Sequence, residues 1–269
     1  MANTGDSLLR VWRDPPAVGA VNMALDEALA AESARLGAVL VRLSTWDRPT
    51  LSLGAFQRLA DARGCEAVAG IDLVRRPSGG GAIVHGGDVT LAIAVPRGHP
   101  LGHTPQSLYD LVHGALVAEL ADRGVEARLS AGVGGPQDRS ATPDGPLFCF
   151  DRRAVGDVVI PSSGGDPRGD AKILGSAQRR LPGAVLQHGS LLLEANRGVP
   201  PAARHPGLFD LVPATAGGTE ALVDGWLARI SRGFGSTAAA EPGPFAPGEG
   251  SGFRETLVRY SSPEWIGRK

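Results

Sequence analysis

Lys172-Ile-Leu-Gly-Ser-Ala-Gln178, followed after a short interval by Gln187-His-Gly-Ser-Leu-Leu-Leu193, predicts two neighbouring β-strands, over Lys172–Gln178 and Ser190–Leu193. Short strands that follow one another through tight turns favour antiparallel pairing, and the helical patterns before, between and after them indicate an α+β chain. We therefore expect a mixed, mostly antiparallel β-sheet core flanked by helices. The other β-prone runs are Val39–Leu43, Thr50–Leu53, Ile71–Arg75, Ile83–His85, Asp88–Val95, Val125–Leu129 and Gly156–Ile160.

Four segments have the pattern of helices. Residues 19–36 place apolar side chains at helical spacing, and Gly37 is suited to end the helix. Thr104-Pro105 offers an N-cap and a proline at the first helical position of a segment that Gly124 closes. Two shorter helices are predicted over Glu220–Ile230 and Phe253–Tyr260, and the segments 130–146 and 161–170 are predicted to be loops.

The composition restricts the class of protein. The chain has 269 residues and a formal net charge of −1, which argues against non-specific binding to nucleic acid or to an anionic membrane. Two cysteines cannot make a disulfide framework or a zinc site, so no metal is expected. The first residues show no basic segment followed by an apolar stretch, and no apolar run approaches the ~20 residues of a membrane helix. We expect a cytoplasmic protein.

Lys172 and Lys269 are the only lysines among 27 basic residues. An ammonium is a compact point charge that can lose its proton when it is desolvated, whereas a guanidinium is planar, forked and permanently charged. A site that must place a small positive charge against one oxygen can therefore require lysine. If the segment is a regular strand, Lys172 shares one face with Leu174, Ser176 and Gln178.

A glycine-rich stretch, Arg75-Arg-Pro-Ser-Gly-Gly-Gly-Ala-Ile-Val-His85, follows a predicted strand. Three consecutive glycines allow close approach of a ligand and can expose several backbone N–H groups to it. Because two arginines precede the three glycines, the expected ligand group is a phosphate or a carbonyl oxygen. The stretch matches neither a Walker loop nor a dinucleotide fingerprint, and a plain glycine-rich hairpin stays open as an alternative.

Two further patterns concern cysteine and histidine. Cys149 lies between Phe148 and Phe150, which is typical of a small buried hydrophobic residue; it becomes a nucleophile only if a cation such as Lys172 keeps it ionised. His85 and His188 precede or end apolar strands, where a lone histidine is more often a hydrogen-bonded structural residue than a catalytic one; the functional role that we expect for them is to shape a site. No role is assigned to the remaining histidines: His99, His103, His113 and His205.

Together these stretches resemble the lipoate/octanoate branch of the biotin/lipoate protein ligase and transferase family. Arg75–His85 is similar to the family's Arg-Arg-x-Ser/Thr-Gly-Gly-x-Ala-x-x-His signature, and Lys172–Gln178 with the next strand is similar to its lysine strand. The remaining matches are its first helix at Asn22–Leu29, its early hairpin at Trp46–Gln57 and its ending at Tyr260–Trp265.

The resemblance implies the fold of the family's catalytic domain and transfer of an octanoyl or lipoyl group to a lysine of a lipoyl carrier domain. Cys149 matches the cysteine of the ligase-like octanoyltransferases, which implies a Cys149 thioester, octanoyl–acyl carrier protein as donor and no cofactor. The acceptors would be the glycine cleavage H protein or dehydrogenase E2 subunits. Catalytic roles fall on Cys149 and Lys172. Substrate contacts fall on Arg75, Arg76, Ser78, Gly79, Gly80, Gly81, His85, Gly175, Ser176 and His188.

Alternatives stay open within the family and outside it. A lipoate–protein ligase would use Mg-ATP to make an acyl-adenylate and would leave Cys149 incidental, while an amidotransferase would take its acyl group from another lipoyl domain. A biotin ligase fits less well, and an inactive carrier-protein-binding module is the non-enzyme alternative. The expected organisation is an acyl-transfer domain over residues 1–235, an Ala/Pro/Gly linker over 236–252, and a helix and tail over 253–269 that pack on the same domain.

Overall fold

An eight-stranded sheet in the order β11-β1-β2-β6-β10-β9-β8-β7 forms the centre of the fold. The computed structural model describes residues 9–132, 147–165, 169–212, 218–237, 239–248 and 252–268. Three more strands make a small second sheet in the order β4-β3-β5. The strands are β1 (Arg10–Arg13), β2 (Leu40–Ser44), β3 (Thr50–Leu53), β4 (Asp72–Arg75), β5 (Ile83–His85), β6 (Asp88–Pro96), β7 (Arg128–Leu129), β8 (Val158–Ile160), β9 (Ala171–Leu181), β10 (Ala184–Leu192) and β11 (Ala239–Ala240).

The strand pairing is mixed and mostly antiparallel, which confirms the predicted α+β class. From β2 through β6, β10, β9 and β8 to β7, every neighbouring pair of the large sheet is antiparallel. Parallel pairing occurs where β1 meets β2 and β11, and where β3 meets β4. The predicted buried strand at Asp88–Val95 is β6, in the middle of the sheet.

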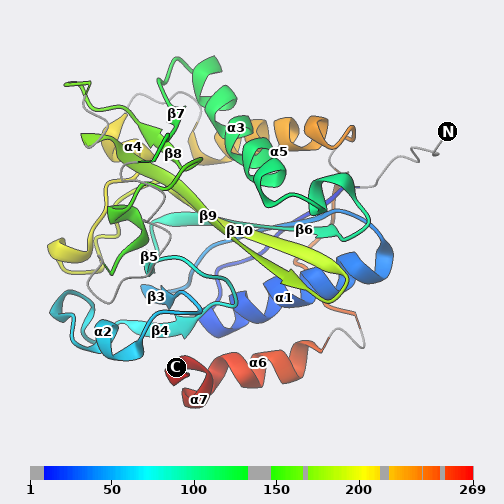
Figure 1. Cartoon of the computed structure of the whole chain (residues 1–269), viewed down its shortest axis with the longest axis horizontal. Helices are drawn as coiled ribbons and strands as arrows, with labels where there is room; N and C mark the ends of the chain where they lie inside the picture. Colours follow the sequence, from blue (N-terminus) through cyan, green and yellow to red (C-terminus); the bar gives the residue numbers. More distant parts are fainter. Residues whose placement is uncertain are drawn as a thin grey trace.

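Helices cover both faces of the large sheet (Figure 1). In that view α3 and α5 lie above the sheet, α1 lies below it, and α6 lies below α1. No helix within the described ranges is long and apolar enough to cross a membrane. The helices are α1 (Gly19–Leu36), α2 (Leu59–Arg63), α3 (Pro105–Asp122), α4 (Leu208–Leu211), α5 (Gly218–Gly233), α6 (Phe253–Ser261) and α7 (Pro263–Gly267), with 3-10 turns at Glu66–Val68, Pro100–Gly102, Cys149–Asp151 and Pro201–Ala203.

All four predicted helices are present, and their ends follow from local chemistry. Gly37 ends α1 in the left-handed conformation, with φ of 64°, which glycine adopts without a steric penalty. Pro105 occupies the first turn of α3, although the Thr104 side chain makes no capping hydrogen bond there. The apolar side of α3 faces the sheet through Leu108, Val112, Leu116 and Leu120, all of which belong to the larger core cluster.

Several strands differ from the prediction in length. β10 begins six residues before the predicted Ser190, since all of Ala184–Leu192 is buried between β6 and β9. The predicted strand Val125–Leu129 shortens to β7 at the exposed edge of the sheet. The predicted strands did not include β1 or β11; β11 has only two residues, too few to show a period in the sequence.

The C-terminal segments pack against the rest of the chain. Ala239–Ala240 pairs with β1, and Phe245 is buried edge-on against Trp12 with ring centroids 5.1 Å apart. In α6, the Tyr260 hydroxyl donates to Glu27 of α1 at 2.7 Å. The division of the chain into an acyl-transfer domain over residues 1–235, a linker over 236–252 and a helix and tail over 253–269 stays a prediction. Residues 133–146 and 166–168, within the two predicted loops, lie outside the described residues.

Candidate functional site

The side chains of a cysteine, a lysine and an aspartate meet beside the first residues of β9. The Lys172 ammonium lies 3.3 Å from Cys149 Sγ and 2.8 Å from Asp157 Oδ2. Lys172 and Asp157 are 5% and 4% exposed, whereas Cys149 is half-buried. The site therefore combines a reachable thiol with an ion pair that is shielded from water.

The position of Cys149 depends on the third glycine of the glycine-rich stretch. The Cys149 N–H donates to the Ala82 carbonyl at 2.7 Å, which holds the start of the Cys149–Asp151 turn against the segment after Gly81. A Cβ on Gly81 would lie only 2.8 Å from the Cys149 nitrogen, so a larger residue would push the cysteine backbone away. The glycine-rich stretch and Cys149 are therefore in direct backbone contact.

Lys172 reaches this site because β9 contains a bulge. Val158 pairs with Leu174 and Val159 pairs with Lys172. Two consecutive residues of β8 therefore pair with residues of β9 that are two apart, and Ile173 is the extra, bulged residue between them. Lys172 consequently lies on the side of Gly175, whose Cβ would be 2.4 Å from Lys172 Cε. The predicted common face of Lys172, Leu174, Ser176 and Gln178 is wrong, because a bulge shifts the alternation by one residue.

Charge, rather than burial, sets the protonation of the lysine. Burial alone would lower the pKa of Lys172, but the nearby charges of Cys149 and Asp157 outweigh it and raise the pKa above its usual 10.5. Lys172 therefore stays an ammonium through neutral and mildly alkaline pH. This positive charge lies 3.3 Å from Cys149 Sγ, the atom through which a cysteine acts as a nucleophile.

The Arg76 guanidinium holds the glycine-rich stretch in place through hydrogen bonds to its backbone carbonyls. Its guanidinium donates to the carbonyl of Gly79 at 2.8 Å, to that of Gly81 at 2.6 Å and to that of Ser52 at 2.8 Å. Burial lowers the pKa of Arg76 to about 10, which still leaves it charged at neutral pH. Because the Gly79 carbonyl points at Arg76, the N–H of the same peptide, that of Gly80, points away from the guanidinium.

Arg75 lies away from this pocket. Its fully buried guanidinium donates to the carbonyls of Gly54, Gln57 and Ile266 at 2.7–2.9 Å, and its own carbonyl accepts from Trp265 Nε1 at 2.8 Å. Arg75 thus joins the C-terminal helix α7 to the strand that leads into the glycine-rich stretch. A direct substrate contact for Arg75 stays a prediction that its surroundings do not favour.

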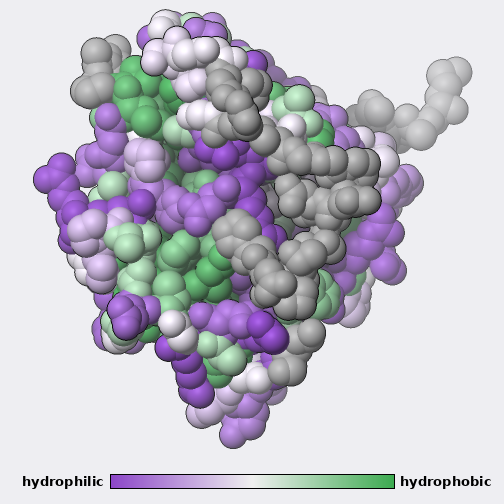
Figure 2. All heavy atoms as spheres, turned by 60° about the vertical axis from the view of Figure 1, so that its left-hand side comes forward, coloured by the Kyte–Doolittle hydropathy of each residue, from purple (hydrophilic) through white to green (hydrophobic). Residues whose placement is uncertain are grey.

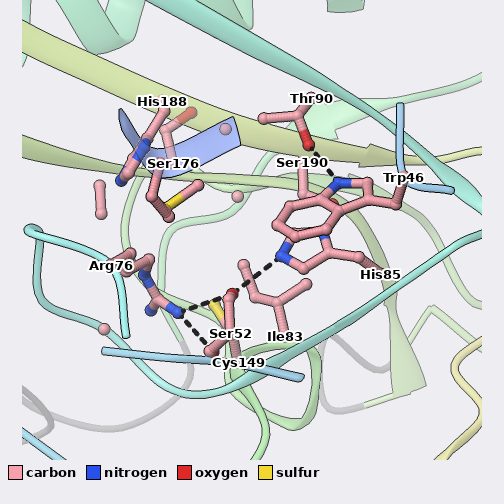
Figure 3. Close-up of a pocket in the computed structure, with 15 residues that line it drawn as sticks. Trp46, Ser52, Arg76, Ile83, His85, Thr90, Cys149, Ser176, His188 and Ser190 are labelled. Carbon is pink, nitrogen blue, oxygen red and sulfur yellow. Dashed lines mark hydrogen bonds between the residues drawn. The ribbon is translucent and has the colours of Figure 1, made fainter. Parts of the chain in front are cut away.

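Cys149 is one of the residues that line a pocket of about 430 Å³, a volume that includes the open solvent at its mouth (Figure 3). Three of its apolar side chains come from separate segments of the chain: Met23, Trp46 and Ile83. The remaining lining residues are Ser52, Arg76, Gly80, His85, Thr90, Cys149, Gly175, Ser176, Ala177, His188, Gly189 and Ser190.

His85 lies deep in this pocket within a polar network. Its Nε2 lies 2.8 Å from Ser52 Oγ and its Nδ1 lies 2.7 Å from Asp88 Oδ2, while Trp46 stacks on the ring at 3.8 Å between centroids. Burial disfavours the ionised form of Asp88, but His85 and other hydrogen-bond donors outweigh this and lower its pKa. The network fixes one wall of the pocket, as expected for a residue that shapes a site.

His188 and Ser78 meet across the pocket wall, although 110 residues separate them in the chain. Ser78 Oγ is hydrogen-bonded to His188 Nε2, and His188 Nδ1 lies 3.1 Å from Asp26 Oδ2 of α1. The predicted site residues Ser78 and His188 are therefore brought together, while Ser78 itself is 1% exposed and is not part of the pocket lining.

Ser176 contacts a histidine to which the sequence assigned no role. His113 of α3 is fully buried; its Nδ1 donates to the Gly156 carbonyl at 2.6 Å and its Nε2 lies 2.6 Å from Ser176 Oγ. Burial lowers the pKa of His113, so the ring is neutral and Nε2 accepts from the Ser176 hydroxyl. His113 thereby ties the turn that carries Asp157 to the strand that carries Lys172.

Asp157, Asp26 and His113 are site residues that the sequence did not reveal. Each of the three contacts its partner only after distant segments have packed together. Asp157 follows the left-handed Gly156 in the chain, which is the only local sign of a tight turn at this position. Among the residues that the structure describes, no group of three or more His, Cys, Asp or Glu side chains could hold a metal ion.

The rim of the site includes an exposed aromatic ring. Phe56 is 63% exposed, and a Cβ on Gly79 would lie 3.5 Å from its ring, so Phe56 covers the outer side of the glycine-rich stretch. Figure 2 shows the side of the molecule that is on the left in Figure 1, and there hydrophobic side chains gather between two bands of hydrophilic ones.

Substituting Gly175 tests how tightly Lys172 is held. In Gly175→Ala the new Cβ would occupy the position of Lys172 Cε, and the flexible lysine side chain would move away from Cys149. We expect turnover to fall by ~10²-fold, the scale for a 1 Å misplacement of a reacting group, with an unfolding temperature within a few degrees of wild type. Gly98→Ala, which adds a methyl group in open space, is the matched control. Equal activity of the two variants would contradict this geometry.

A thiol beside an ammonium and a glycine-rich stretch, in the lining of a pocket, is an arrangement suited to group transfer. Residues 19–202 match the family model of the lipoyl protein ligase A/B catalytic domain. The chain belongs to this family, which confirms the resemblance found in the sequence.

Relatives and solved structures agree with this assignment. The chain is 32% identical over 270 residues to octanoyltransferase LipM of Moorella thermoacetica, covering 92% of this chain and 93% of the relative. It is 31% identical to octanoyltransferase LipM of Kyrpidia tusciae, covering 93% and 95%. Its fold is similar to that of the bipartite lipoate protein ligase of Thermoplasma acidophilum, with a TM-score of 0.68, 20% identity, and coverage of 97% and 96%.

Proposed function

We propose that this protein is an octanoyltransferase that moves an octanoyl group from acyl carrier protein to a lysine of a lipoyl domain, through a thioester on Cys149. The observation that carries the proposal is the 3.3 Å distance between Cys149 Sγ and Lys172 Nζ. The relatives named octanoyltransferase LipM, which match over more than nine-tenths of the chain, support the same activity.

In the first half of the reaction the Cys149 thiolate attacks the carbonyl carbon of the donor thioester. A tetrahedral intermediate forms, and its oxygen carries the negative charge. The Lys172 ammonium and the outward-pointing N–H of Gly80 are the candidate donors to that oxygen. Collapse of the intermediate breaks the donor C–S bond, leaves octanoyl-Cys149 and releases the donor thiol after it takes up one proton.

In the second half the ε-amine of a lipoyl-domain lysine attacks the Cys149 thioester. The amine must be neutral to act, and a positive charge nearby lowers its pKa. Lys172 supplies this charge and also stabilises the Cys149 thiolate that leaves, because it lies 3.3 Å from the sulfur. The products are an amide, the original thiolate–ammonium pair and one proton.

The pocket beside Cys149 is the proposed binding site for the octanoyl chain. Met23, Trp46 and Ile83 offer apolar contacts to a medium-length chain whose carbonyl lies at Cys149. The thioester already carries the energy for amide formation, so this reaction needs neither ATP nor another cofactor.

The proposed partners follow from this chemistry. The donor is octanoyl–acyl carrier protein, and the acceptors are lipoyl domains such as those of the glycine cleavage H protein or dehydrogenase E2 subunits. A similar fold occurs in the Thermoplasma acidophilum ligase that was studied with its E2 lipoyl domain, which supports the class of acceptor.

The test is an assay of the purified protein with octanoyl–acyl carrier protein and a lipoyl domain, without ATP. We expect octanoylation of the lipoyl domain and, when the acceptor is omitted, an octanoyl adduct on Cys149 by intact mass and peptide mapping. Octanoylation that requires free octanoate and Mg-ATP, with no adduct on Cys149, would replace this proposal with the ligase. An adduct formed from an octanoylated lipoyl domain but not from the carrier protein would indicate the amidotransferase.

A further inference from the structure

His205, a histidine to which the sequence assigned no role, contacts the turn that carries the candidate nucleophile. Its Nε2 lies 2.9 Å from Asp151 Oδ1. A carboxylate oxygen only accepts, so Nε2 donates this hydrogen bond. The ring lies edge-on to Phe148 with centroids 5.4 Å apart and is tilted against Phe150 at 5.8 Å. His205 therefore contacts the residue before Cys149 and both residues after it in the turn.

The backbone of the same turn is anchored separately, to the glycine-rich stretch. The Ala82 N–H donates to the Leu147 carbonyl at 2.9 Å, and the Ala82 carbonyl accepts from the Cys149 N–H at 2.7 Å. These two bonds hold the main chain up to the cysteine, whereas His205 contacts the side chains that flank it. The position of the sulfur therefore depends on two sets of contacts, of which the histidine supplies one.

The ring contacts of His205 are stronger than its hydrogen bond. Asp151 is exposed, and a hydrogen-bonded pair that water reaches contributes little. The phenylalanines at 148 and 150 are both buried, and the separations of their rings from the imidazole fall within the 4.5–7 Å of favourable aromatic pairs. The imidazole thus holds the turn mainly by packing, and the hydrogen bond orients the ring.

The segment that carries His205 is itself fixed against the core. Val199 and Ala203, which precede it, are buried in the apolar cluster that also contains the first phenylalanine of the turn. After it, Gly207 lies so close to Leu193 that a Cβ on the glycine would be 2.3 Å from the Leu193 carbonyl carbon. A histidine on a segment that is held on both sides can hold its neighbours in place.

The contact with Phe150 extends to the lysine of the site. The Lys172 ammonium lies 5.5 Å from the centroid of the Phe150 ring, within the ~6 Å of a cation–π contact. One buried ring therefore contacts both His205 and the ammonium, and it belongs to the residue that follows Cys149. A shift of this ring would change the separation between the sulfur and the ammonium.

We propose that His205 is a positioning residue, which holds Cys149 Sγ beside the Lys172 ammonium by fixing the side chains of the turn over residues 148–151. Its effect on the reaction rests on the proposed octanoyl transfer. The residues that line the pocket in the described part of the chain do not include His205, so it acts through the turn and not on the substrate. A 1 Å misplacement of a reacting group can cost ~10²-fold in rate, so a loosened turn slows acylation without weakening donor binding.

Three substitutions separate the contacts of His205. His205→Phe keeps a ring against the two phenylalanines but removes the hydrogen bond, and His205→Gln keeps a donor for Asp151 but removes the ring. His205→Ala removes both contacts. His103→Ala, at an exposed position, is the matched control. Because the ring contacts are the stronger ones, His205→Phe should stay closer to wild type than His205→Gln.

The experiment measures acylation of Cys149 alone. Each variant is mixed with increasing octanoyl–acyl carrier protein in single-turnover mode, and octanoyl-Cys149 is followed by intact mass. We expect His205→Ala to lower the saturating rate constant by ~10–10²-fold, with the donor concentration at half-saturation unchanged within about two-fold. His205→Phe and His205→Gln should lie between His205→Ala and wild type, and His103→Ala should match wild type.

The amplitude of the same reaction distinguishes positioning from stability. A residue that only stabilises the fold would lower the unfolding temperature and the fraction of enzyme that reacts, but the enzyme that remains folded would react at the wild-type rate. A wild-type saturating rate constant in His205→Ala would therefore overturn this inference, whatever its unfolding temperature.

The other outcomes separate this inference from the proposed function. Failure of the wild-type protein to form octanoyl-Cys149 would overturn the proposed function, and the inference with it. If wild type forms the adduct, a raised half-saturation concentration with an unchanged rate constant would make His205 a donor-binding residue and overturn the positioning role alone. Equally low rate constants in all three variants would require the imidazole itself, as a catalytic group does, and would also overturn it.

Discussion

Cys149→Ser is expected to abolish octanoyl-enzyme formation and to lower turnover with the carrier-protein donor on the order of 10⁶-fold, as loss of a catalytic nucleophile does in other enzymes. The Lys172 ammonium, 3.3 Å from the sulfur, can favour a thiolate, but a serine hydroxyl is far too weak an acid to ionise there. The measurements are intact mass after incubation with octanoyl–acyl carrier protein and the steady-state rate of lipoyl-domain octanoylation.

Cys65→Ser is the matched control for this variant. Cys65 is the other free cysteine, is partly buried like Cys149 and packs among apolar residues near α2. We expect this variant to keep the wild-type rate. Because Cys149→Ser changes one atom in a half-buried side chain, its unfolding temperature should stay close to wild type. Full activity of Cys149→Ser would show that the cysteine is incidental and would refute the thioester mechanism.

Lys172→Arg is expected to lower the rate of Cys149 acylation by ~10²–10³-fold, the usual effect of losing one donor to an oxyanion. The charge is kept, but the geometry is not. Gly175 already lies against the lysine side chain, so a wider planar guanidinium cannot place one donor between Cys149 and Asp157 in the same space. Single-turnover acylation, followed by intact mass, measures the effect, and a wild-type rate would remove the argument for a specific ammonium.

Removing the charge separates catalysis from stability. Lys172→Met leaves the buried Asp157 carboxylate without its cation, and breaking a buried ion pair in this way costs roughly 3–5 kcal/mol of unfolding free energy. The double variant Lys172→Met/Asp157→Asn removes both charges and is expected to recover most of that stability while staying inactive. Recovery of activity in the double variant would contradict the role of the ammonium.

Thiol reactivity gives an independent measure of the same pair. At neutral pH, iodoacetamide should alkylate Cys149 more slowly in the double variant than in wild type, because no ammonium favours the thiolate there. Cys65 in the same sample is the internal reference. An unchanged ratio of the two alkylation rates would mean that Lys172 does not activate the thiol.

Much of the fold could be predicted because its long elements carry strong local signals. Gly19–Leu36 and Pro105–Asp122 show helical spacing over 18 residues each, and Asp88–Pro96 is apolar enough to be recognised as a central strand. The strand β11 was missed, since it is held by backbone pairing with β1 and leaves no pattern in two alanines. The strand that carries Lys172 was recognised, but its bulge was not.

The candidate site was predicted in its separate pieces. Cys149, Lys172 and the glycine-rich stretch are the residues that the structure brings together, and His188 and Ser78 meet on the same pocket wall. Arg75, by contrast, contacts the C-terminal helix. The roles of Asp157 and Asp26 were not predicted. An aspartate near a turn or within a helix has no sequence feature that identifies the distant residue it contacts.

The sequence by itself determined the α+β class, the family and the short list of reactive side chains, because hydrophobic spacing and glycine-rich motifs are local properties of the chain. Only the tertiary structure decided that Lys172 faces Cys149 and Asp157, since a single bulged residue, Ile173, reverses the side on which the lysine lies. It also decided that His188 meets Asp26, 162 residues away. Contacts of this kind depend on strand register and helix packing, which no local stretch of sequence encodes.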